Sequence, residues 1–226
     1  MVQRIIGRIE RSKVMKNSKE MLSVYFIAGT QDIQNGDHLP SVLESALKAG
    51  ITCFQYREKG KGSLPHPEAK KEMAQICQQL CEQYQVPFLI NDDVALALEI
   101  GADGIHVGQK DQAIEEVLTL FTDKIVGLSC HDEQEVLVAN ELAGITYYGI
   151  GPIYGTISKE DAELPIGIAK LKELTEKACK PVVAIGGINT KNAQSVLETH
   201  VDGVSVITAI TLAKDIKEAV GNLKQH

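Results

Sequence analysis

The sequence has a deficit of basic charge. It contains 23 lysine and arginine residues against 30 aspartate and glutamate residues, which gives a formal net charge of -7. General nucleic-acid binders and proteins that bind membrane surfaces need a basic field, so we expect neither activity. The sequence also has no apolar stretch of the roughly 18 residues that a bilayer-spanning helix requires. Any anionic ligand must therefore be held by a few placed groups.

Cysteine is scarce and unpatterned. The five cysteines are Cys53, Cys77, Cys81, Cys130 and Cys179. They form no CxxC pair and follow no secretory leader, so we expect reduced thiols and a cytoplasmic location. Cys77 and Cys81 have helical i, i+4 spacing, but no histidine lies near enough in sequence to predict a metal site. Cys130 precedes His131, yet adjacent residues of an extended segment point apart, so this pair does not indicate a nucleophile.

Short apolar runs alternate with longer stretches of helical periodicity from Leu22 onward. We predict strands at 23–28, 52–57, 88–91, 104–107, 125–128, 147–150, 182–185 and 203–207. We predict helices at 39–49, 67–84, 94–100, 114–121, 133–143, 168–178, 190–199 and 215–224. This alternation indicates a parallel sheet covered by helices, and closing the sheet gives a (βα)8 TIM barrel. An open doubly wound sheet is the alternative, but no glycine-rich dinucleotide fingerprint follows the first strand.

The chain shows no linker or low-complexity segment that would divide it. We therefore expect one catalytic barrel domain over residues 22–226. Residues 1–21 are rich in Arg, Lys and Ser, and we expect them to form a short N-terminal extension that covers one end of the fold.

The second predicted strand ends in groups that can bind an anion. Alternation along the strand places Gln55 and Arg57 on one face and Tyr56 on the other, and Lys59 follows in a glycine-bearing turn. A guanidinium at a buried strand end needs a partner, because desolvating a charge costs several kcal/mol or more. That partner is either a ligand or a local acid such as Glu58.

Carboxylates follow the third and fourth predicted strands. Asp92 and Asp111 would meet at the carboxyl ends of neighbouring strands, where two carboxylates suit a hard divalent cation. The competing interpretation is that these acids cap the helices that follow. We expect Asp93 to cap and Asp92 to bind metal.

The last two predicted strands end in residues that suit a phosphate. Gly186-Gly187 at the seventh strand and Ile207-Thr208 at the eighth fit a phosphate site made mostly of backbone N–H groups, because glycine allows close backbone approach and a helix N-terminus supplies a positive dipole end. His106 lies within an apolar strand, and we expect a hydrogen-bonded barrel histidine rather than a base. Together with the cationic groups after the second strand, these sites suggest one diphosphate and one monophosphate ligand side by side. Such a pair suggests a transfer in which diphosphate leaves.

Five motifs along the chain resemble those of the thiamine phosphate synthase family. They are Gln55-Tyr56-Arg57-Glu58-Lys59, Asn91-Asp92-Asp93, Gly104-Ile105-His106-Val107-Gly108-Gln109-Lys110-Asp111, Gly149-Ile150-Gly151-Pro152-Ile153-Tyr154 with Thr156 and Lys159, and Ala184-Ile185-Gly186-Gly187-Ile188. The resemblance implies a Mg2+-dependent barrel enzyme that joins hydroxymethylpyrimidine diphosphate to hydroxyethylthiazole phosphate. The products would be thiamine phosphate and diphosphate.

The resemblance also implies a role for each matched residue. The pyrimidine diphosphate would be held by Gln55, Tyr56, Arg57, Glu58, Lys59, Asn91, Ser129 and Lys159, of which Arg57, Lys59, Ser129 and Lys159 would assist catalysis. The thiazole phosphate would be held by Thr156, Ile157, Ser158, Gly187, Ile207 and Thr208. Asp92 and Asp111 would bind magnesium. In the family the diphosphate departs first and the thiazole nitrogen captures the remaining cation, which requires charge neutralisation and alignment rather than a general base.

Two other functions fit the same barrel. A thiazole tautomerase resembles the synthase but has no departing diphosphate, so it would not need Asp92 and Asp111. A catalytically idle regulatory barrel would bind a precursor without turnover, and loss of an aspartate or Arg57 would have favoured it. The expected partners are the two small-molecule substrates, with neither nucleic acid nor membrane. The sequence leaves the oligomeric state open, with a homo-oligomer among the alternatives.

Overall fold

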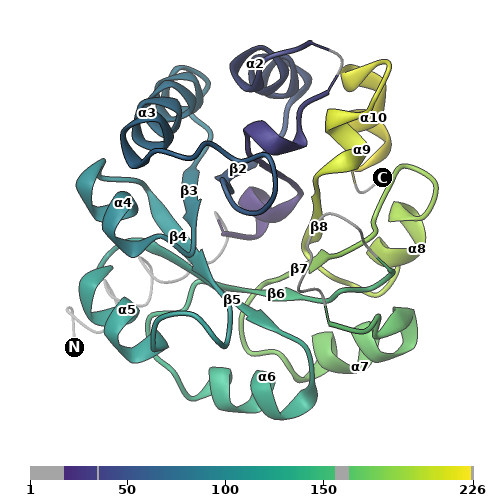
Figure 1. Ribbon diagram of the computed structural model, residues 1–226. Helices are drawn as coiled ribbons and strands as arrows, with labels where there is room; N and C mark the ends of the chain where they lie inside the picture. The colour runs from purple at the N-terminus through teal and green to yellow at the C-terminus, as the bar shows by residue number, and fades with distance from the viewer. Residues whose placement is uncertain (1–17, 35, 156–162, 225–226) are drawn as a thin grey trace, which may run out of the picture.

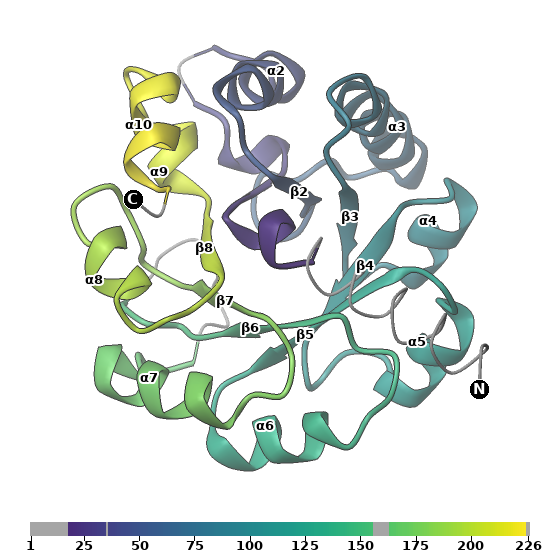
Figure 2. The same ribbon diagram turned by 180° about the vertical axis from the view of Figure 1, so that it is seen from behind.

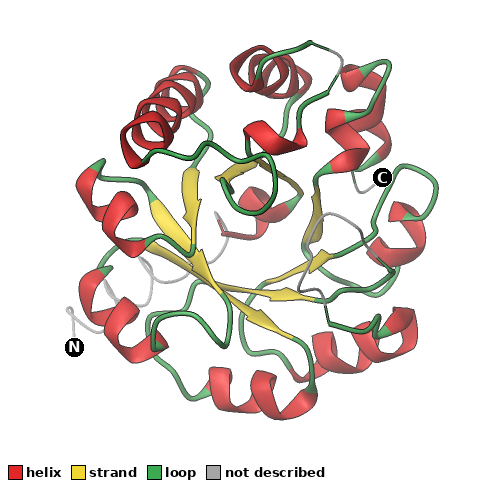
Figure 3. Cartoon of the chain, in the orientation of Figure 1, coloured by secondary structure: helices red, strands yellow, loops and turns green. Residues whose placement is uncertain are grey.

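The computed structural model describes residues 18–34, 36–155 and 163–224 of the chain. Eight parallel strands form a closed barrel in chain order, in which β8 returns to pair with β1. The helices surround the strands (Figures 1 and 3). The strands are β1 (Val24–Ala28), β2 (Cys53–Tyr56), β3 (Phe88–Asn91), β4 (Gly104–Val107), β5 (Ile125–Cys130), β6 (Tyr147–Ile150), β7 (Val182–Ile185) and β8 (Gly203–Val206). The predicted (βα)8 TIM barrel is confirmed, and the open doubly wound sheet is wrong.

The strands are short and apolar because a parallel barrel strand is covered on both sides. All five residues of β1 are buried, for example. The register aligns Val24 of β1 with Val204 of β8 and Tyr25 with Cys53 of β2. Every strand thus has two hydrogen-bonded neighbours, and the view from behind shows the same closed ring (Figure 2).

Helices follow the strands on the outside of the barrel. They are α2 (Leu39–Ala49), α3 (Pro67–Gln83), α4 (Val94–Glu99), α5 (Ile114–Leu120), α6 (Glu133–Asn140), α7 (Gly167–Lys177), α8 (Ala193–Leu197), α9 (Thr208–Thr211) and α10 (Ile216–Asn222), with a 3-10 turn η1 (Thr30–Asp32) after β1. Aspartates cap the starts of α4 and α6: Asp93, as predicted, accepts a hydrogen bond from Leu96 N, and Asp132 accepts one from Glu135 N, each at 2.9 Å. Among the described residues, no helix has the length and apolar character to cross a membrane.

The seventh predicted helix and the end of β8 differ from the prediction. The helix was predicted at 190–199, but α8 begins at Ala193 and ends at Leu197. The side chain of Asn192 accepts a hydrogen bond from Asn189 N at 2.8 Å, which closes a turn before the helix. The four-residue helix α9 directly after β8 was not predicted, because one helical turn is too short to show a periodic pattern.

Side chains of the strands alternate between two cores. Phe54 and Tyr56 pack in the outer core between the barrel and its helices, as the alternation predicted. The inner core fills the barrel and contains Met21, Leu22, Tyr25, Ile27, Cys53, Leu89, Tyr147 and Val183. Residues 18–22 are helical and lead directly into β1. Met21 and Leu22 therefore join the inner core from the segment before β1, whereas residues 1–17 of the predicted extension lie outside the described part of the chain.

Candidate active site

A cavity of about 230 Å³ opens at the carboxyl ends of the strands. Residues that follow β2, β3, β4, β5, β7 and β8 line it together, although they come from the whole length of the chain. The predicted site residues on this lining are Arg57, Lys59, Asn91, Asp92, Asp111, Ser129, Gly187, Ile207 and Thr208. The barrel therefore brings most of the predicted diphosphate, metal and thiazole phosphate groups to one place.

The cations and carboxylates meet on one side of this cavity. Lys59 Nζ lies 2.8 Å from Asp92 Oδ2, and Asp92 has a left-handed backbone with φ 60. Burial raises the pKa of Asp111, and the neighbouring carboxyl group of Asp92 raises it further. Asp92 thus lies close enough to disfavour the negative charge of Asp111.

The capping interpretation applies to only one of the three aspartates. Asp93 caps α4. The side chain of Asp111 instead accepts a hydrogen bond from Gly108 N at 2.7 Å, and Ala113 occupies the cap position of α5. Asp92 and Asp111 therefore keep carboxylate oxygens on the cavity lining, and they do not serve as helix caps.

Arg57 and Glu58 are adjacent in the sequence, but their side chains make different contacts. Arg57 is 5% exposed and lines the cavity, whereas Glu58 accepts hydrogen bonds from Thr30 N at 2.9 Å and Leu64 N at 2.7 Å. The carboxylate of Glu58 thus ties two loops together and does not line the cavity. Arg57 also lowers the pKa of Asp32, against a larger increase caused by burial of that acid.

Gln55 and Tyr56 do not line the cavity either. Gln55 points into the barrel, is 1% exposed, and its amide Nε2 donates to Tyr25 OH at 2.7 Å. Tyr56 packs in the outer core. The structure therefore separates the predicted diphosphate residues into a set on the cavity lining and a set that supports the end of β2. Thr156, Ile157, Ser158 and Lys159 lie outside the described residues.

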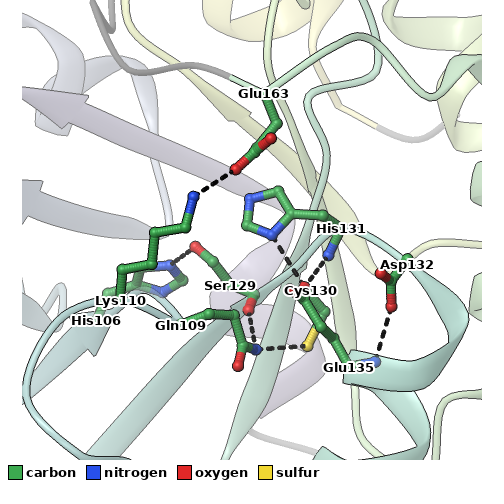
Figure 4. A network of polar contacts seen from close by, with 9 residues as sticks. All are labelled: His106, Gln109, Lys110, Ser129, Cys130, His131, Asp132, Glu135 and Glu163. Atoms are coloured by element: carbon green, nitrogen blue, oxygen red, sulfur yellow. Dashed lines mark hydrogen bonds and ion pairs between the residues drawn. The ribbon is translucent and has the colours of Figure 1, made fainter.

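Ser129 sits in a polar network on the cavity wall (Figure 4). His106 Nε2 lies 2.9 Å from Ser129 Oγ, and Gln109 Nε2 donates to Ser129 O at 2.7 Å. The predicted hydrogen-bonded role of His106 is confirmed. Cys130 is buried, and burial raises the pKa of its thiol to about 12. A thiol of that pKa is not an activated nucleophile, which agrees with the prediction.

Several polar residues of the cavity lining were not predicted as site residues. Gln109, His131 and Glu163 line the cavity. His131 Nδ1 lies 2.9 Å from Glu135 Oε2, and Lys110 Nζ lies 3.0 Å from Glu163 Oε1 (Figure 4). The sequence signal for His131 was its place directly after β5, where barrel loops open toward the site.

Another side of the cavity lies beside the neighbouring strands β7 and β8, whose following loops line it. Gly186 has φ 97 and Gly187 has φ 65, a conformation that side chains rarely adopt. A Cβ at Gly187 would lie 2.6 Å from Gly155 O and 2.7 Å from Tyr154 Cβ. The glycine at this position therefore keeps the loop after β7 close to the loop after β6. Thr208, at the start of α9, lines the same side.

Comparison with known proteins assigns the family. The sequence profile described as thiamine monophosphate synthase matches residues 24–210. The thiamine-phosphate synthase of Listeria welshimeri is 58% identical over 207 residues, which cover 91% of this chain and 99% of the relative. That of Latilactobacillus sakei is 48% identical over 209 residues, covering 92% of this chain and 93% of the relative. The solved structure of thiamine phosphate pyrophosphorylase from Pyrococcus furiosus has a TM-score of 0.78 at 33% identity and covers 91% of this chain and 95% of its own. The chain belongs to the thiamine monophosphate synthase family.

Proposed function

We propose that this protein joins hydroxymethylpyrimidine diphosphate to hydroxyethylthiazole phosphate and releases thiamine phosphate and diphosphate. The observation that carries the proposal is the single cavity in which Arg57 and Lys59 lie beside Asp92 and Asp111. A departing diphosphate needs positive charge at its oxygens, and this lining supplies it. Family membership supports the same reaction.

The cavity lining suggests how two substrates are held. Arg57, Lys59, Asn91 and Ser129 would bind the pyrimidine diphosphate, and the backbone at Gly187 would accept the thiazole phosphate. Ile207 and Thr208 line the cavity on the same side as Gly187. The role proposed for Lys159 rests on the family motif. Holding both substrates in one cavity supplies proximity and orientation, which lower the barrier of a two-substrate reaction.

We assign indirect roles to three other residues of the β2 motif. Gln55 is bonded to Tyr25 inside the barrel, Tyr56 packs outside it, and Glu58 accepts hydrogen bonds from two loops. These contacts fix the end of β2, from which Arg57 and Lys59 extend into the site.

The carboxylate pair fits a magnesium ion. Within the described part of the chain, no group of three or more His, Cys, Asp or Glu side chains could hold a metal. Two oxygen ligands nevertheless suit Mg2+, which keeps several waters and takes further oxygens from substrate phosphates. Asp92 and Asp111 would hold the ion. Burial and, after it, the neighbouring Asp92 raise the pKa of Asp111, and a bound cation would favour its ionised form. When bound, the ion supplies positive charge to the leaving diphosphate.

The reaction needs no proton transfer from the protein. The carbon–oxygen bond to diphosphate breaks with its electron pair on the diphosphate, and the thiazole nitrogen supplies the pair that forms the new carbon–nitrogen bond. The protein therefore binds, aligns and neutralises charge. This agrees with a cavity lined by the cationic side chains of Arg57 and Lys59.

A two-substrate assay tests this function. Formation of thiamine phosphate should require both substrates and Mg2+, each omitted in turn. Asp92→Asn should lower kcat by about a hundredfold or more, the size seen when one electrostatic group of a site is removed. Asparagine tolerates the left-handed backbone at position 92, so the folded state should persist. Asp93→Asn is the matched control, since it makes the same charge change and keeps a capping side chain. An Asp92→Asn enzyme with full, magnesium-independent turnover would remove the proposed role of the pair.

We also propose a cytoplasmic location, supported by five cysteines that are all unpaired. Assembly into a homo-oligomer stays a prediction that light scattering of the purified protein would test.

A further inference from the structure

A chain of hydrogen-bonded side chains runs through the barrel interior and ends at the cavity. Gln55 Nε2 donates to Tyr25 OH at 2.7 Å, and Tyr25 OH lies 2.8 Å from Tyr147 OH. Tyr147 OH lies 2.9 Å from His106 Nδ1, and His106 Nε2 lies 2.9 Å from Ser129 Oγ. The last member, Ser129, lines the cavity (Figure 4). The interior of the barrel is thus connected to the ligand site by side chains alone.

The hydroxyl groups of Tyr25 and Tyr147 can each donate one hydrogen bond. Tyr25 is 1% exposed and Tyr147 is fully buried, and burial raises the pKa of both phenols well above the ordinary value. Both are therefore neutral, and each hydroxyl donates one hydrogen bond while it accepts others. A buried hydroxyl that leaves its proton without an acceptor costs about 1–3 kcal/mol, so each proton is directed to a partner in the chain.

These constraints give the chain one direction. Tyr25 accepts from Gln55, so it donates to Tyr147. Tyr147 accepts from Tyr25 and therefore donates to His106 Nδ1. With Nδ1 accepting, the neutral imidazole carries its proton on Nε2 and donates to Ser129 Oγ. Ser129 has then accepted a bond from His106, and its own proton is left for an acceptor elsewhere.

The imidazole ring is also fixed in place. A Cβ at Gly149 would lie 2.9 Å from His106 Cε1, and a Cβ at Gly127 would lie 2.5 Å from His106 Nδ1 and 2.2 Å from Tyr147 Cζ. The rings of His106 and Tyr147 are stacked with centroids 5.5 Å apart. Two glycines thus leave the space that the ring fills, and hydrogen bonds at both ring nitrogens hold its orientation.

We infer that Tyr147 and His106 are positioning residues that turn the hydroxyl proton of Ser129 toward the cavity, where it donates to a phosphate oxygen of the substrate. The inference rests on the proposed function for the identity of the acceptor. A hydroxyl aimed in this way is a donor to an anion, whereas the opposite direction of the chain would present an oxygen lone pair to it. The interior of the barrel therefore decides whether Ser129 attracts or repels a diphosphate.

Nitrogen NMR of histidine tests the direction without any turnover. His106 in the wild-type protein should show a bare Nδ1 and a protonated Nε2, assigned by the loss of its signals in His106→Gln. Tyr147→Phe removes the donor to Nδ1, so the Nδ1 resonance should shift and the Nδ1–H form should become populated. Tyr148→Phe is the matched control, because Tyr148 OH donates to Asn140 on the outside of the barrel at 3.0 Å. It should leave the His106 signals unchanged.

A double-mutant cycle tests the link to the ligand. Ser129→Ala should raise KM for the diphosphate substrate about tenfold, the order expected for losing one hydrogen bond to a charged group. Tyr147→Phe should raise KM in the same direction by up to the same factor, with a smaller change in kcat. In the Ser129→Ala background, Tyr147→Phe should add nothing, because the hydroxyl through which it acts is gone. Thermal unfolding of each variant shows that the change in KM is measured on folded protein.

The histidine tautomer and the double-mutant cycle can each overturn the inference. A wild-type His106 that carries its proton on Nδ1 would overturn it, as would multiplicative effects of Ser129→Ala and Tyr147→Phe on KM. If the purified protein formed no thiamine phosphate at all, the proposed function would fail. The tautomer of His106 measured by NMR would still decide whether the hydrogen bonds run from Gln55 toward Ser129.

Discussion

Replacing Asp111 by asparagine should have opposite effects on stability with and without magnesium. The pKa of Asp111 is raised by burial and by Asp92, so its negative charge is unfavourable in the folded protein without a cation. Asparagine removes that charge and can still accept the hydrogen bond from Gly108 N. Asp111→Asn should therefore unfold at a slightly higher temperature than the wild type when no divalent ion is present. The gain should stay below about 1 kcal/mol, since the group is partly exposed and solvent screens it.

Magnesium should reverse this order. An ion that binds only the folded state stabilises it by RT ln(1 + [L]/Kd), which is about 1.4 kcal/mol at roughly ten times Kd. For a chain of this length such a gain raises Tm by about 3–6 °C. The wild type should show this increase, and Asp111→Asn should lose most of it, because one of the two charged oxygen ligands is gone.

The assay is thermal unfolding over a magnesium titration, at constant ionic strength. Asp93→Asn is the control, because it removes the same charge beside the site and keeps the cap of α4. It should respond to magnesium as the wild type does. An equal magnesium-induced shift in wild type and Asp111→Asn would refute the assignment of Asp111 as a ligand.

The pH dependence of stability should also differ between the wild type and Asp111→Asn, with and without magnesium. A carboxyl group with a raised folded pKa stabilises the protein at low pH, and this contribution is lost as pH rises through the raised value. Without magnesium, the stability of the wild type relative to Asp111→Asn should therefore fall as pH increases from below the ordinary aspartate pKa. With magnesium the difference should change sign at higher pH, because the ion requires ionised carboxylates.

Three further outcomes follow from the described contacts. Asp93→Ala should lower the free energy of unfolding by about 1 kcal/mol through loss of the bond from Leu96 N, with Asp93→Asn close to wild type in urea denaturation. A thiol reagent should modify one cysteine rapidly in the native protein, Cys179, since the other four are buried, and a second fast thiol would contradict the packing. Gly187→Ala should destabilise by at least about 1–2 kcal/mol, because it combines a left-handed backbone with a Cβ 2.6 Å from Gly155 O. Wild-type stability of that variant would show that the loop can move apart.

The sequence predicted the fold well because barrel strands have a simple signal. Each strand is a short apolar run and each helix a periodic one, so the eight strands could be located and their closure proposed. The same logic placed Arg57, Asp92 and Ser129 near one another, since the carboxyl ends of parallel strands share one face. Helix ends were less accurate where side chains close a turn, as Asn192 does before α8.

The sequence could not show which residue each polar side chain forms a hydrogen bond with. Glu58 lies in one of the matched motifs, but its carboxylate accepts a hydrogen bond from Thr30 N, which is 28 positions away. Gln55 similarly donates a hydrogen bond to Tyr25 on the neighbouring strand β1, 30 positions away in the sequence. Alternation along a strand predicts the face on which a side chain lies, but it does not predict whether that side chain reaches the ligand cavity. His131 was missed for a related reason, because its orientation depends on Glu135 in the following helix.

The pairing of β1 with β8 joins the first strand to the last. During synthesis, β1 leaves the ribosome long before β8, so its outer edge has no native neighbour until residues 203–206 have emerged. Over the same interval β7 presents a second open edge, and unpaired edges are templates for association with other chains. A chain cut short before Gly203 is consequently an aggregation-prone species and not a smaller folded unit.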